Sequence, residues 1–358
     1  MIVLDGSHGE GGGSIIRFSF ALSTLTKQEI RINNIRAKRK QSGLRTQHLV
    51  GVKAINDIFA GKISHADVGS TELSFKPICE PTEPVLDEYT IKIGTAGSIS
   101  LVMQALRLAL AKTQSKITLN FDGGATYGKW APSIDYLKFV TEPTLKLFGY
   151  RADIEIKKHG FYPKGGAEIL ISVFPEENCF QKDFNTLPKI KKISGISIAS
   201  KHLKRAKVAE RQAKTAEKIL FDQLELDVDI DIDYVDADSP GSGITLWTVF
   251  EGSNDTNPPI GATNQGEKGI SSEKIGKNVA QFLINEIRTE GAIDQYLCDQ
   301  IIPYAALRSP FSFSTSKITL HSETNINLVE NFLPVRFFID KSQSSKNIRV
   351  KRIDTDSI

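Results

Sequence analysis

The sequence predicts a mixed α/β (α+β) fold in which one structural unit is repeated and a smaller α/β domain is inserted. Short strand-like segments alternate with amphipathic, helix-like segments along most of the chain. The order glycine turn, helix, strand, helix, strand occurs at least twice before about residue 180, which indicates an internal structural repeat. Near Pro188 the chain becomes lysine-rich, and the earlier pattern resumes after about residue 290.

The repeated elements begin at the N-terminus. Apolar residues recur at helical spacing in residues 14–25 and 46–59, and strand-like segments are found at 1–4, 30–35, 73–76 and 89–93. The order then restarts with a predicted turn at 94–98, helix 99–111, strand 116–121, a turn at 123–124, a helix from Pro132 to about 147, strand 152–157, a turn at 163–166 and strand 167–174. Pro132 suits the first turn of a helix.

A small inserted α/β domain is predicted over residues 187–290, so the main domain comprises residues 1–186 and 291–340. The predicted elements of the insert are strands 193–199, 226–234 and 244–251, helices 204–223 and 271–288, and a Gly/Asn/Pro-rich loop at 253–269. The main domain ends with helix 292–307, strand 317–321, helix 325–332 and strand 335–339. We expect residues 341–358 to form a polar, frayed C-terminal tail.

Composition excludes several classes of protein. The 358 residues include 45 Lys and Arg against 42 Asp and Glu, a net charge of +3, so bulk charge does not indicate a nucleic-acid-binding protein. The composition also excludes collagen, intrinsic disorder and coiled coils. The sequence shows no membrane-spanning run and no signal peptide pattern. Cys79, Cys179 and Cys298 form no CxxC motif. We therefore expect a cytoplasmic protein with reduced cysteines and no membrane partner.

The first candidate site is the glycine cluster around Glu10, formed by Gly9, Gly11, Gly12 and Gly13 at a strand-to-helix turn. Such a turn lets a ligand approach the backbone, and the helix N-terminus offers N–H groups to an anion. It matches neither the P-loop nor the dinucleotide-binding pattern. A carboxylate repels phosphate unless a cation bridges them, so Glu10 is a candidate Mg²⁺ ligand or, alternatively, a solvated turn acid.

The second candidate site is the basic segment that contains Arg36, Lys38, Arg39, Lys40 and Arg45, with Arg17 one element away. Arginine forks can bind several phosphate oxygens, and no aromatic side chain lies among them for base stacking. A solvated charge run is the alternative interpretation. The nearby glycine turns and Glu10 favour a polyanion site.

The third candidate is His321, which is predicted to end strand 317–321. A histidine there could be a nucleophile, an acid or base, or only a helix-cap residue. The sequence contains no HExxH or GxSxG motif. The alternating Asp227, Asp229, Asp231 and Asp233 share one face of a predicted strand, which favours a solvated face over a metal site.

Taken in order, these segments resemble the RNA 3'-terminal phosphate cyclase family. The resemblance is carried by residues 5–17, 35–49, 97–104, 159–166, 296–300 and 332–337, together with His321, Thr324 and Asn325. It covers residue 1 to about 340 and is weak between about 187 and 290. Ala167 stands where the family usually has a third glycine.

The resemblance implies tandem βαβαββ-type units, as in the cyclase and enolpyruvyl transferase class, and a thioredoxin-like insert. It also implies a ligase that converts an RNA 3'-phosphate to a 2',3'-cyclic phosphate with ATP and Mg²⁺ or Mn²⁺. In such enzymes a histidine is adenylylated with release of pyrophosphate, AMP passes to the RNA 3'-phosphate, and the neighbouring 2'-OH then expels AMP.

The resemblance assigns roles to individual residues. His321 matches the nucleophile and Glu10 a metal ligand. Residues that match nucleotide contacts are Gln104, Pro132, Tyr296, Asp299 and Gln300. Residues that match the phosphate and RNA-end site are Arg17, Arg36, Arg39, Arg45, Gln47 and His48. The implied partner is RNA with a 3'-phosphate end, and a homodimer is possible.

Three alternatives are compatible with parts of this pattern. A non-catalytic ribosome-assembly relative of the same fold is expected to lack the nucleophile, so His321 with Glu10 and Arg17 argues against it. An enolpyruvyl-type transferase acting on a small phosphorylated metabolite would form no covalent nucleotide. A plain RNA-binding module would bind RNA regardless of the state of its 3' end.

Overall fold

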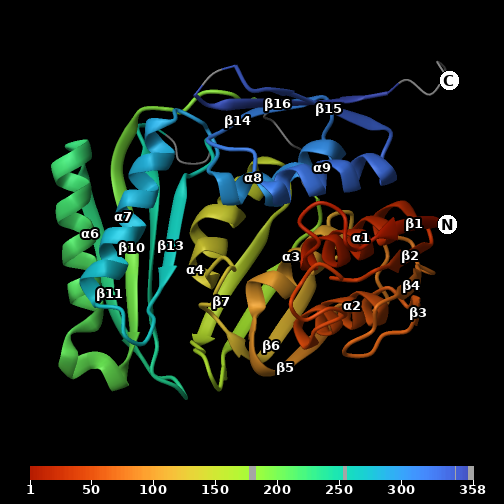
Figure 1. The fold of residues 1–358 in the computed structure, drawn as a ribbon, viewed down its shortest axis with the longest axis horizontal. Coiled ribbons are helices and arrows are strands. Elements are labelled where there is room, and N and C mark those ends of the chain that lie inside the picture. Colours follow the sequence, from red (N-terminus) through yellow and green to blue (C-terminus); the bar gives the residue numbers. More distant parts are fainter. Residues whose placement is uncertain (177–182, 253–255, 343, 354–358) are drawn as a thin grey trace.

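The structure, a computed structural model, describes residues 1–176, 183–252, 256–342 and 344–353. Within these residues the strands form four sheets of four strands each. Three of the sheets belong to repeats of one unit, and the fourth belongs to residues 190–265 (Figure 1). The mixed α/β fold predicted from the sequence is confirmed.

The first repeat has the order βαβαββ. Its elements are β1 (Ile2–Asp5), α1 (Gly13–Thr26), β2 (Ile30–Asn33), α2 (Thr46–Ile58), β3 (Lys62–Ser64) and β4 (Leu73–Lys76). The strands lie in the order β1-β2-β4-β3, with β1 and β2 parallel and the other pairs antiparallel. The predicted helices and strands of this region are found within a few residues of their expected ends.

The second repeat has the same order. Its elements are β5 (Glu88–Ser98), α3 (Ile99–Ala109), β6 (Ile117–Ala125), α4 (Ile134–Tyr136), a π-helical turn (Leu137–Thr141), α5 (Glu142–Leu147), β7 (Ala152–Lys158) and β8 (Glu168–Val173). The strand order is β5-β6-β8-β7. The turns predicted at 94–98 and 123–124 were wrong, because these residues continue β5 and β6. At Gly123, where φ is +91°, a Cβ would lie 2.2 Å from the Ile93 carbonyl oxygen, so glycine permits close strand contact rather than a turn.

The third repeat is split by a long insertion. Its elements are β9 (Asp183–Phe184), α8 (Gln295–Leu307), β14 (Phe311–Thr315), α9 (Leu320–Phe332), β15 (Val335–Asp340) and β16 (Lys346–Arg352). The strand order β9-β14-β16-β15 is that of the other two repeats. Residues 185–294 therefore separate the first strand of this repeat from its first helix.

Two predictions for the third repeat were wrong. The strand predicted at 317–321 is absent: β14 ends at Thr315, and α9 already includes His321. The frayed tail is also absent over Lys346–Arg352, because β16 is hydrogen-bonded between β14 and β15. Ile348 and Val350 of β16 are fully buried. Their alternation with charged residues indicates a strand, but the polar composition of the C-terminal segment obscured this pattern.

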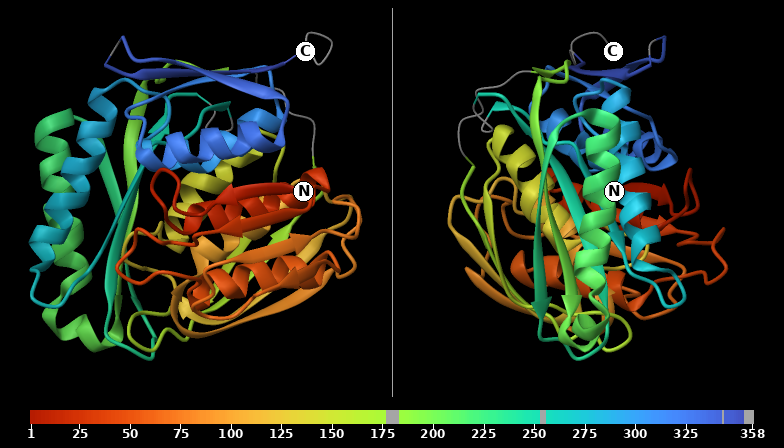
Figure 2. Two further views of the ribbon diagram at one scale, coloured as in Figure 1. Left: turned by 45° about the vertical axis from the view of Figure 1, so that its right-hand side comes forward. Right: turned by 90° about the vertical axis from the view of Figure 1, so that its left-hand side faces the viewer.

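The inserted segment forms its own sheet and cluster. Its elements are β10 (Ile190–Ser200), a 3₁₀ turn (Lys201–Ala206), α6 (Val208–Leu224), β11 (Asp227–Val235), β12 (Ser242–Phe250), β13 (Gly261–Gln265) and α7 (Ser272–Arg288). The strands lie in the order β11-β10-β12-β13, and α6 and α7 lie side by side against this sheet (Figures 1 and 2). The aspartates of β11 are exposed, as their spacing predicts. The predicted loop at 253–269 was wrong in part because β13 lies within it; residues 253–255 of it are outside the described residues.

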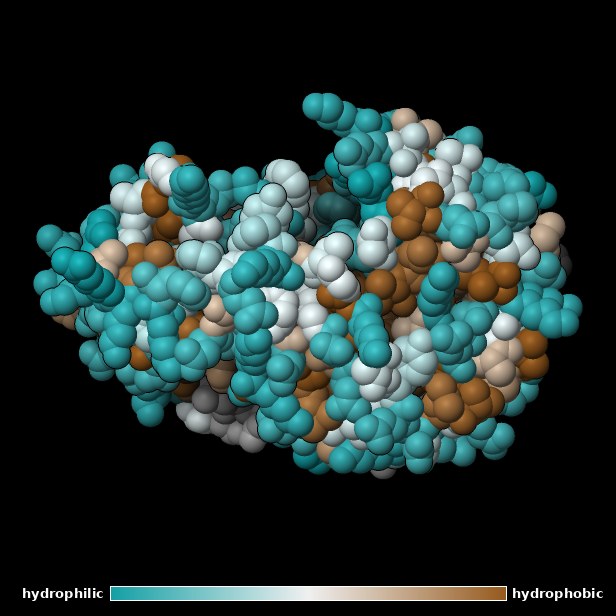
Figure 3. Space-filling view, turned by 90° about the horizontal axis from the view of Figure 1, so that it is seen from below, coloured by the Kyte–Doolittle hydropathy of each residue, from teal (hydrophilic) through white to brown (hydrophobic). Residues whose placement is uncertain are grey.

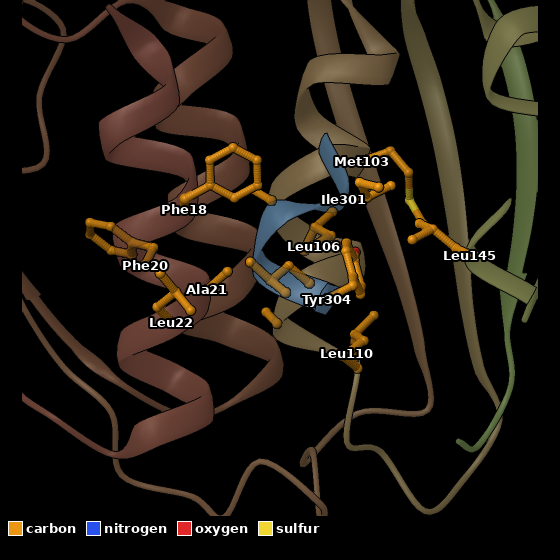
Figure 4. Packing of buried hydrophobic residues seen from close by; sticks show 14 of the residues in the cluster. Phe18, Phe20, Ala21, Leu22, Met103, Leu106, Leu110, Leu145, Ile301 and Tyr304 are labelled. Carbon is orange, nitrogen blue, oxygen red and sulfur yellow. The ribbon is translucent and has the colours of Figure 1, made fainter. Parts of the chain in front are cut away.

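The three repeats share one core. Its buried residues run from Leu4 to Val350. In Figure 4, Phe18 of α1, Leu106 of α3 and Ile301 of α8 come together from three different repeats. The surface seen from below mixes hydrophilic and hydrophobic side chains, and its larger hydrophobic patches lie on the side of the repeats (Figure 3). Packing of the repeats brings their helices together on one side of each sheet, where the candidate site lies.

Candidate functional site

A cavity of about 470 Å³ lies where the repeats meet the insert. Helices α1, α3, α8 and α9 line it, together with the segment after β6 and strand β13. Helix α1 packs against α9, which joins the first repeat to the third (Figure 1). Seven of the residues predicted from the sequence line this cavity: Arg17, Gln104, Pro132, Tyr296, Asp299, Gln300 and His321.

His321 occupies the first turn of α9 rather than the end of a strand. The helix begins early because Thr319 and Ser322 form a reciprocal capping box: the Ser322 N–H donates to Thr319 Oγ1 at 3.0 Å. The His321 side chain remains 45% exposed and lines the cavity. Burial, with the nearby cations Arg17 and Arg39, lowers the pKa of His321 below its usual value. The ring is therefore neutral at pH 7, which is the form that acts as a nucleophile.

The glycine cluster holds Glu10 beside this histidine. Glu10 Oε2 lies 3.7 Å from His321 Nδ1, and the Glu10 N–H donates to Thr324 Oγ1 at 3.2 Å. At Gly9, where φ is +53°, a Cβ would lie 2.3 Å from Thr324 Oγ1, so a side chain there would push the loop away from α9. Arg39 forms an ion pair with Glu10 and donates to its carbonyl oxygen at 3.2 Å.

The residues around Glu10 fit a metal ion that is bound largely by substrate. Glu10 Oε2 is buried without a hydrogen-bond partner. Within the described part of the chain there is no cluster of three or more His, Cys, Asp or Glu side chains that could hold a metal alone. Mg²⁺ is commonly held by one or two carboxylates and by substrate phosphates. Glu10 is therefore suited to be one protein ligand at such a site.

Arg17 lies between the first two repeats. Its Nε donates to Gln104 Oε1 at 3.0 Å. Burial lowers the pKa of Arg17 to about 10, although Asp299 opposes this effect, and the side chain remains a cation at pH 7. A cation inside the cavity that contains His321 is suited to bind a phosphate.

The basic segment lies beside the cavity rather than in its wall. Arg36, Arg39, Arg45, Gln47 and His48 are not among the residues that line it. The segment nevertheless contacts the site through Arg39, which pairs with Glu10, and through His48. The Arg45 N–H donates to His48 Nδ1 at 3.3 Å. Burial, followed by Arg17, Arg36 and Arg45, lowers the pKa of His48 to about 3, so His48 is a neutral hydrogen-bonding group among cations.

Helix α8 forms the opposite wall. Tyr296 is half exposed, and its ring stacks on Phe282 with 5.1 Å between ring centroids. Gln300 Nε2 donates to the Tyr296 carbonyl oxygen at 2.9 Å, and Asn325 Nδ2 of α9 donates to the Asp299 carbonyl oxygen at 2.8 Å. Burial raises the pKa of Asp299 to about 8 despite the opposing effect of Arg17. This wall combines an aromatic face with hydrogen-bonding groups, as a nucleotide site requires.

The sequence analysis missed the wall that the insert and the second repeat build together. Thr263 and Gln265 of β13 line the cavity with Tyr127 and Ser133. Thr263 Oγ1 donates to Ser133 Oγ at 3.0 Å, and Ser133 Oγ lies 2.9 Å from Thr245 Oγ1. Trp130, which is 95% exposed, stands at the same wall. Little in the sequence indicates this wall, since β13 lacks apolar alternation and the hydroxyl groups meet only across the fold.

Two other sequence predictions concern the cysteines and membrane association. Cys79 and Cys298 are free thiols, and Cys179 lies outside the described residues. Among the described residues, no helix is both long and apolar enough to span a bilayer.

The chain is similar to known proteins over nearly its whole length. Residues 8–339 match the family model described as RNA 3'-terminal phosphate cyclase. A protein of that name from Methanosarcina barkeri is 40% identical over 350 residues, which is 98% of this chain and 100% of the relative. One from Methanothermobacter thermautotrophicus is 41% identical over 344 residues, covering 95% of this chain and 96% of the relative. One from Pyrobaculum aerophilum is 39% identical over 354 residues, covering 98% of both.

Both kinds of match extend across the residues that line the cavity and across the inserted segment. The chain therefore belongs to the RNA 3'-terminal phosphate cyclase family.

Proposed function

We propose that this protein is an RNA 3'-terminal phosphate cyclase that uses ATP to convert an RNA 3'-phosphate to a 2',3'-cyclic phosphate through a covalent His321–AMP intermediate. One observation carries the proposal: a neutral, half-exposed histidine lies in a cavity with the cation Arg17 and within 3.7 Å of the Glu10 carboxylate. A non-catalytic relative would not need this combination. The relatives named above support the overall reaction.

The residues suggest how each step proceeds. His321 Nδ1 faces Glu10, so we infer that Nε2 attacks the α-phosphorus of ATP, and the bond to the β-phosphate oxygen breaks to release pyrophosphate. An oxygen of the RNA 3'-phosphate then takes AMP from the histidine. The 2'-oxygen finally attacks the 3'-phosphorus, loses its proton, and AMP leaves.

The charged residues stabilise these steps. Arg17 lies in the cavity and neutralises charge that develops on the transferred phosphoryl group. Arg36, Arg39, Arg45, Gln47 and His48 would hold the RNA 3' end beside it. Tyr296 and Pro132 would contact the adenine, and Gln104, Asp299 and Gln300 would hydrogen-bond the rest of the nucleotide. Glu10 would hold Mg²⁺ or Mn²⁺, which supplies positive charge against the triphosphate.

The experiment that tests the proposal is incubation with α-labelled ATP and Mg²⁺ without RNA, followed by denaturing electrophoresis. We expect label on the wild-type protein, none on His321→Ala, and normal labelling of His202→Ala, a matched control with an exposed histidine. Peptide mass spectrometry should place the AMP on His321. Labelling that survives in His321→Ala would refute the mechanism.

A second measurement separates the cyclase from the alternatives. The labelled protein should pass AMP to RNA ending in a 3'-phosphate and not to the same RNA ending in a 3'-OH. A plain RNA-binding module would not distinguish the two ends. The cytoplasmic location and the possible homodimer stay predictions.

A further inference from the structure

An open groove of about 820 Å³ crosses the third-repeat sheet. Helices α8 and α9 cover one face of this sheet, and the other face is open at the top of the molecule (Figures 1 and 2). We call this open side the outer β14–β16 face and define it by eight residues that share it and are at least partly exposed: Asp183, Ser312, Arg336, Phe338, Asp340, Asn347, Arg349 and Lys351.

The strand register places an aromatic ring among cations on this face. Phe338 of β15 pairs with Arg349 of β16, which pairs in turn with Ser312 of β14. Arg336 and Lys351 form the neighbouring pair. Phe338 is 57% exposed, although a phenylalanine in a strand is usually directed into the core. Its neighbours Phe337 and Ile339 pack against the core, so the exposure of Phe338 follows from strand alternation.

Two of the three cations on this face are available to a ligand. Arg336 pairs with Glu330 at 2.9 Å. Among the described residues, no carboxylate lies within 4.0 Å of the charged groups of Arg349 or Lys351. A free pair of cations beside an exposed aromatic ring has the chemistry of a surface for single-stranded nucleic acid: phosphates contact the cations and a base stacks on the ring.

The second repeat shows that the sheet of a repeat does not require an excess of cations and an exposed aromatic ring on its outer face. On β7, the strand that corresponds to β15, the exposed residues include Asp153 and Glu155. Its sheet also exposes Asp122 and Glu168. These four carboxylates outnumber the exposed cations Lys92 and Lys157 of that sheet, whereas on the outer β14–β16 face the three cations outnumber the carboxylates Asp183 and Asp340. The outer β14–β16 face is therefore the more favourable of the two for a polyanion.

One end of the outer β14–β16 face adjoins the catalytic helix. Lys341, which directly follows β15, lies 3.4 Å from Glu323 through its Nζ and the Glu323 Oε1. Glu323 is two residues beyond His321 on α9. From Asp340 to Arg336 the strand then leads about 14 Å away from that end, at about 3.4 Å per residue.

We propose that the outer β14–β16 face binds the single-stranded part of the substrate RNA that lies upstream of the 3'-phosphate. The proposal rests on the proposed function, since that function supplies RNA as the substrate. The bound strand passes from His321 over the first turn of α9 to Arg349, Lys351 and Phe338. The enzyme thus gains affinity for longer RNA without reading its sequence, because stacking and phosphate contacts are tolerant of sequence.

The test compares a 4-nucleotide and a 12-nucleotide unpaired RNA, both with 3'-phosphates, in cyclisation and in fluorescence anisotropy. The variants are Arg349→Ala/Lys351→Ala and Phe338→Ala. The matched control is Lys92→Ala/Lys157→Ala, which removes two exposed cations from the sheet of the second repeat.

We expect the wild type and the control to bind the longer RNA at least about fivefold more tightly. Phe338→Ala should lose about fivefold or more of the affinity for the long RNA. Arg349→Ala/Lys351→Ala should raise the KM of the long RNA to that of the short one and leave kcat unchanged. The slope of log K for binding against log salt concentration should become shallower by about 1.4, because two phosphate contacts are lost. Adenylylation without RNA should be equal in all variants, which also verifies that they fold.

Two results would overturn the proposal. One is a length preference that survives in both variants or falls equally in the control. The other is a wild-type dimer in analytical ultracentrifugation that the variants convert to monomer while the length preference stays intact, since the face would then bind a second copy of this chain. Failure of the proposed function is distinguishable, because it would abolish His321 labelling while anisotropy still reports RNA binding.

Discussion

The repeat-built body and the insert are stabilised in different ways. In the body, three repeats bury one continuous cluster that runs from Leu4 to Val350. In the insert, a smaller cluster lies within residues 193–284. The body also buries an ion pair, Arg107 with Glu142, whose side chains are only 5% and 7% exposed. The corresponding pair of the insert, Arg211 with Glu273, is about half exposed.

The junction between the two regions combines apolar and polar contacts. Tyr127 and Phe161 of the body form a buried cluster with Ile198 of the insert. Asp294, the N-cap of α8, accepts hydrogen bonds from the Tyr136 hydroxyl at 2.8 Å and from the Gly261 N–H of β13 at 3.0 Å. The hydroxyl groups of Ser133 and Thr263 meet across the same junction. These contacts position the cavity wall that the insert contributes. The separate hydrophobic clusters support the proposed insert boundaries at 187 and 290. They also imply that a substitution in the insert destabilises the body less than a substitution in the body destabilises the insert.

The largest effect on stability is expected when the buried ion pair of the body, Arg107 with Glu142, is broken. Arg107→Ala leaves the Glu142 carboxylate buried without its cation and removes the hydrogen bond from Arg107 Nη2 to the Tyr150 carbonyl oxygen. We expect the free energy of unfolding to fall by about 3–5 kcal/mol, measured by urea denaturation. Replacing both partners, as Arg107→Met/Glu142→Leu, should recover much of that loss. A single-variant loss below about 1 kcal/mol would show that the body does not depend on this pair.

The next largest effect is expected at the start of α1. A Cβ at Gly13 would lie 2.3 Å from His48 Nε2 and 2.8 Å from Arg17 Nη1. Gly13→Ala should therefore displace both side chains, with a cost of about 1–3 kcal/mol in stability. We also expect cyclase activity to fall at least about tenfold, since small displacements in an active site are costly. Gly94→Ala is the matched control because nothing lies within 4 Å of its Cβ. Equal activity in the two variants would contradict this account.

The difference between local patterns and pairing across the fold explains which elements the sequence could predict. Helices such as α1 and α7 were predictable because their apolar spacing is a local pattern, and in α7 the expected cap Ser271 agrees with it. The strands β13 and β16 were not, because pairing across the fold decides them. Ile348 is buried only because β14 and β15 lie on either side of it.

The candidate site shows the same limit. Motifs identified Glu10, Arg17 and His321, which the fold brings to one site. Thr263 and Ser133 belong to the same cavity but carry no local pattern, because their hydroxyl groups are 130 residues apart in sequence. Sequence also misplaced His321 on a strand, since the β-branched residues before it outweighed the capping pair Thr319 and Ser322.

A smaller effect on stability is expected from protonation of Asp294 at the junction between the body and the insert. Burial and the neighbouring Glu286 raise the pKa of Asp294 to about 7, above its usual value near 3.8. The folded state then holds a proton that the unfolded state releases, so this contribution to stability is fully present below about pH 4 and is lost as pH rises through 7. We expect unfolding free energy to fall between pH 5 and 7 by up to about 1.4 kcal/mol per pH unit.

Asp294→Asn tests this expectation, because the amide does not titrate. Thermal or urea unfolding between pH 5 and 8 should show a smaller pH slope in Asp294→Asn than in the wild type. Asp222→Asn, on the exposed side of α6, is the control and should keep the wild-type slope. An unchanged slope in Asp294→Asn would mean that the junction carboxylate is ionised throughout this range.

The smallest effect is expected at the surface of the insert. Arg211 donates to Glu273 through two nitrogens, at 2.7 and 2.9 Å, and the pair joins α6 to α7. Water screens such a pair, so Arg211→Ala should change the free energy of unfolding by no more than about 0.5 kcal/mol, and less in 1 M salt. Adenylylation of His321 should be unchanged, because among the described residues none from α6 or α7 lines the cavity. A loss comparable to that of Arg107→Ala would show that the insert, like the body, depends on one charge pair, and the contrast between the two regions would fail.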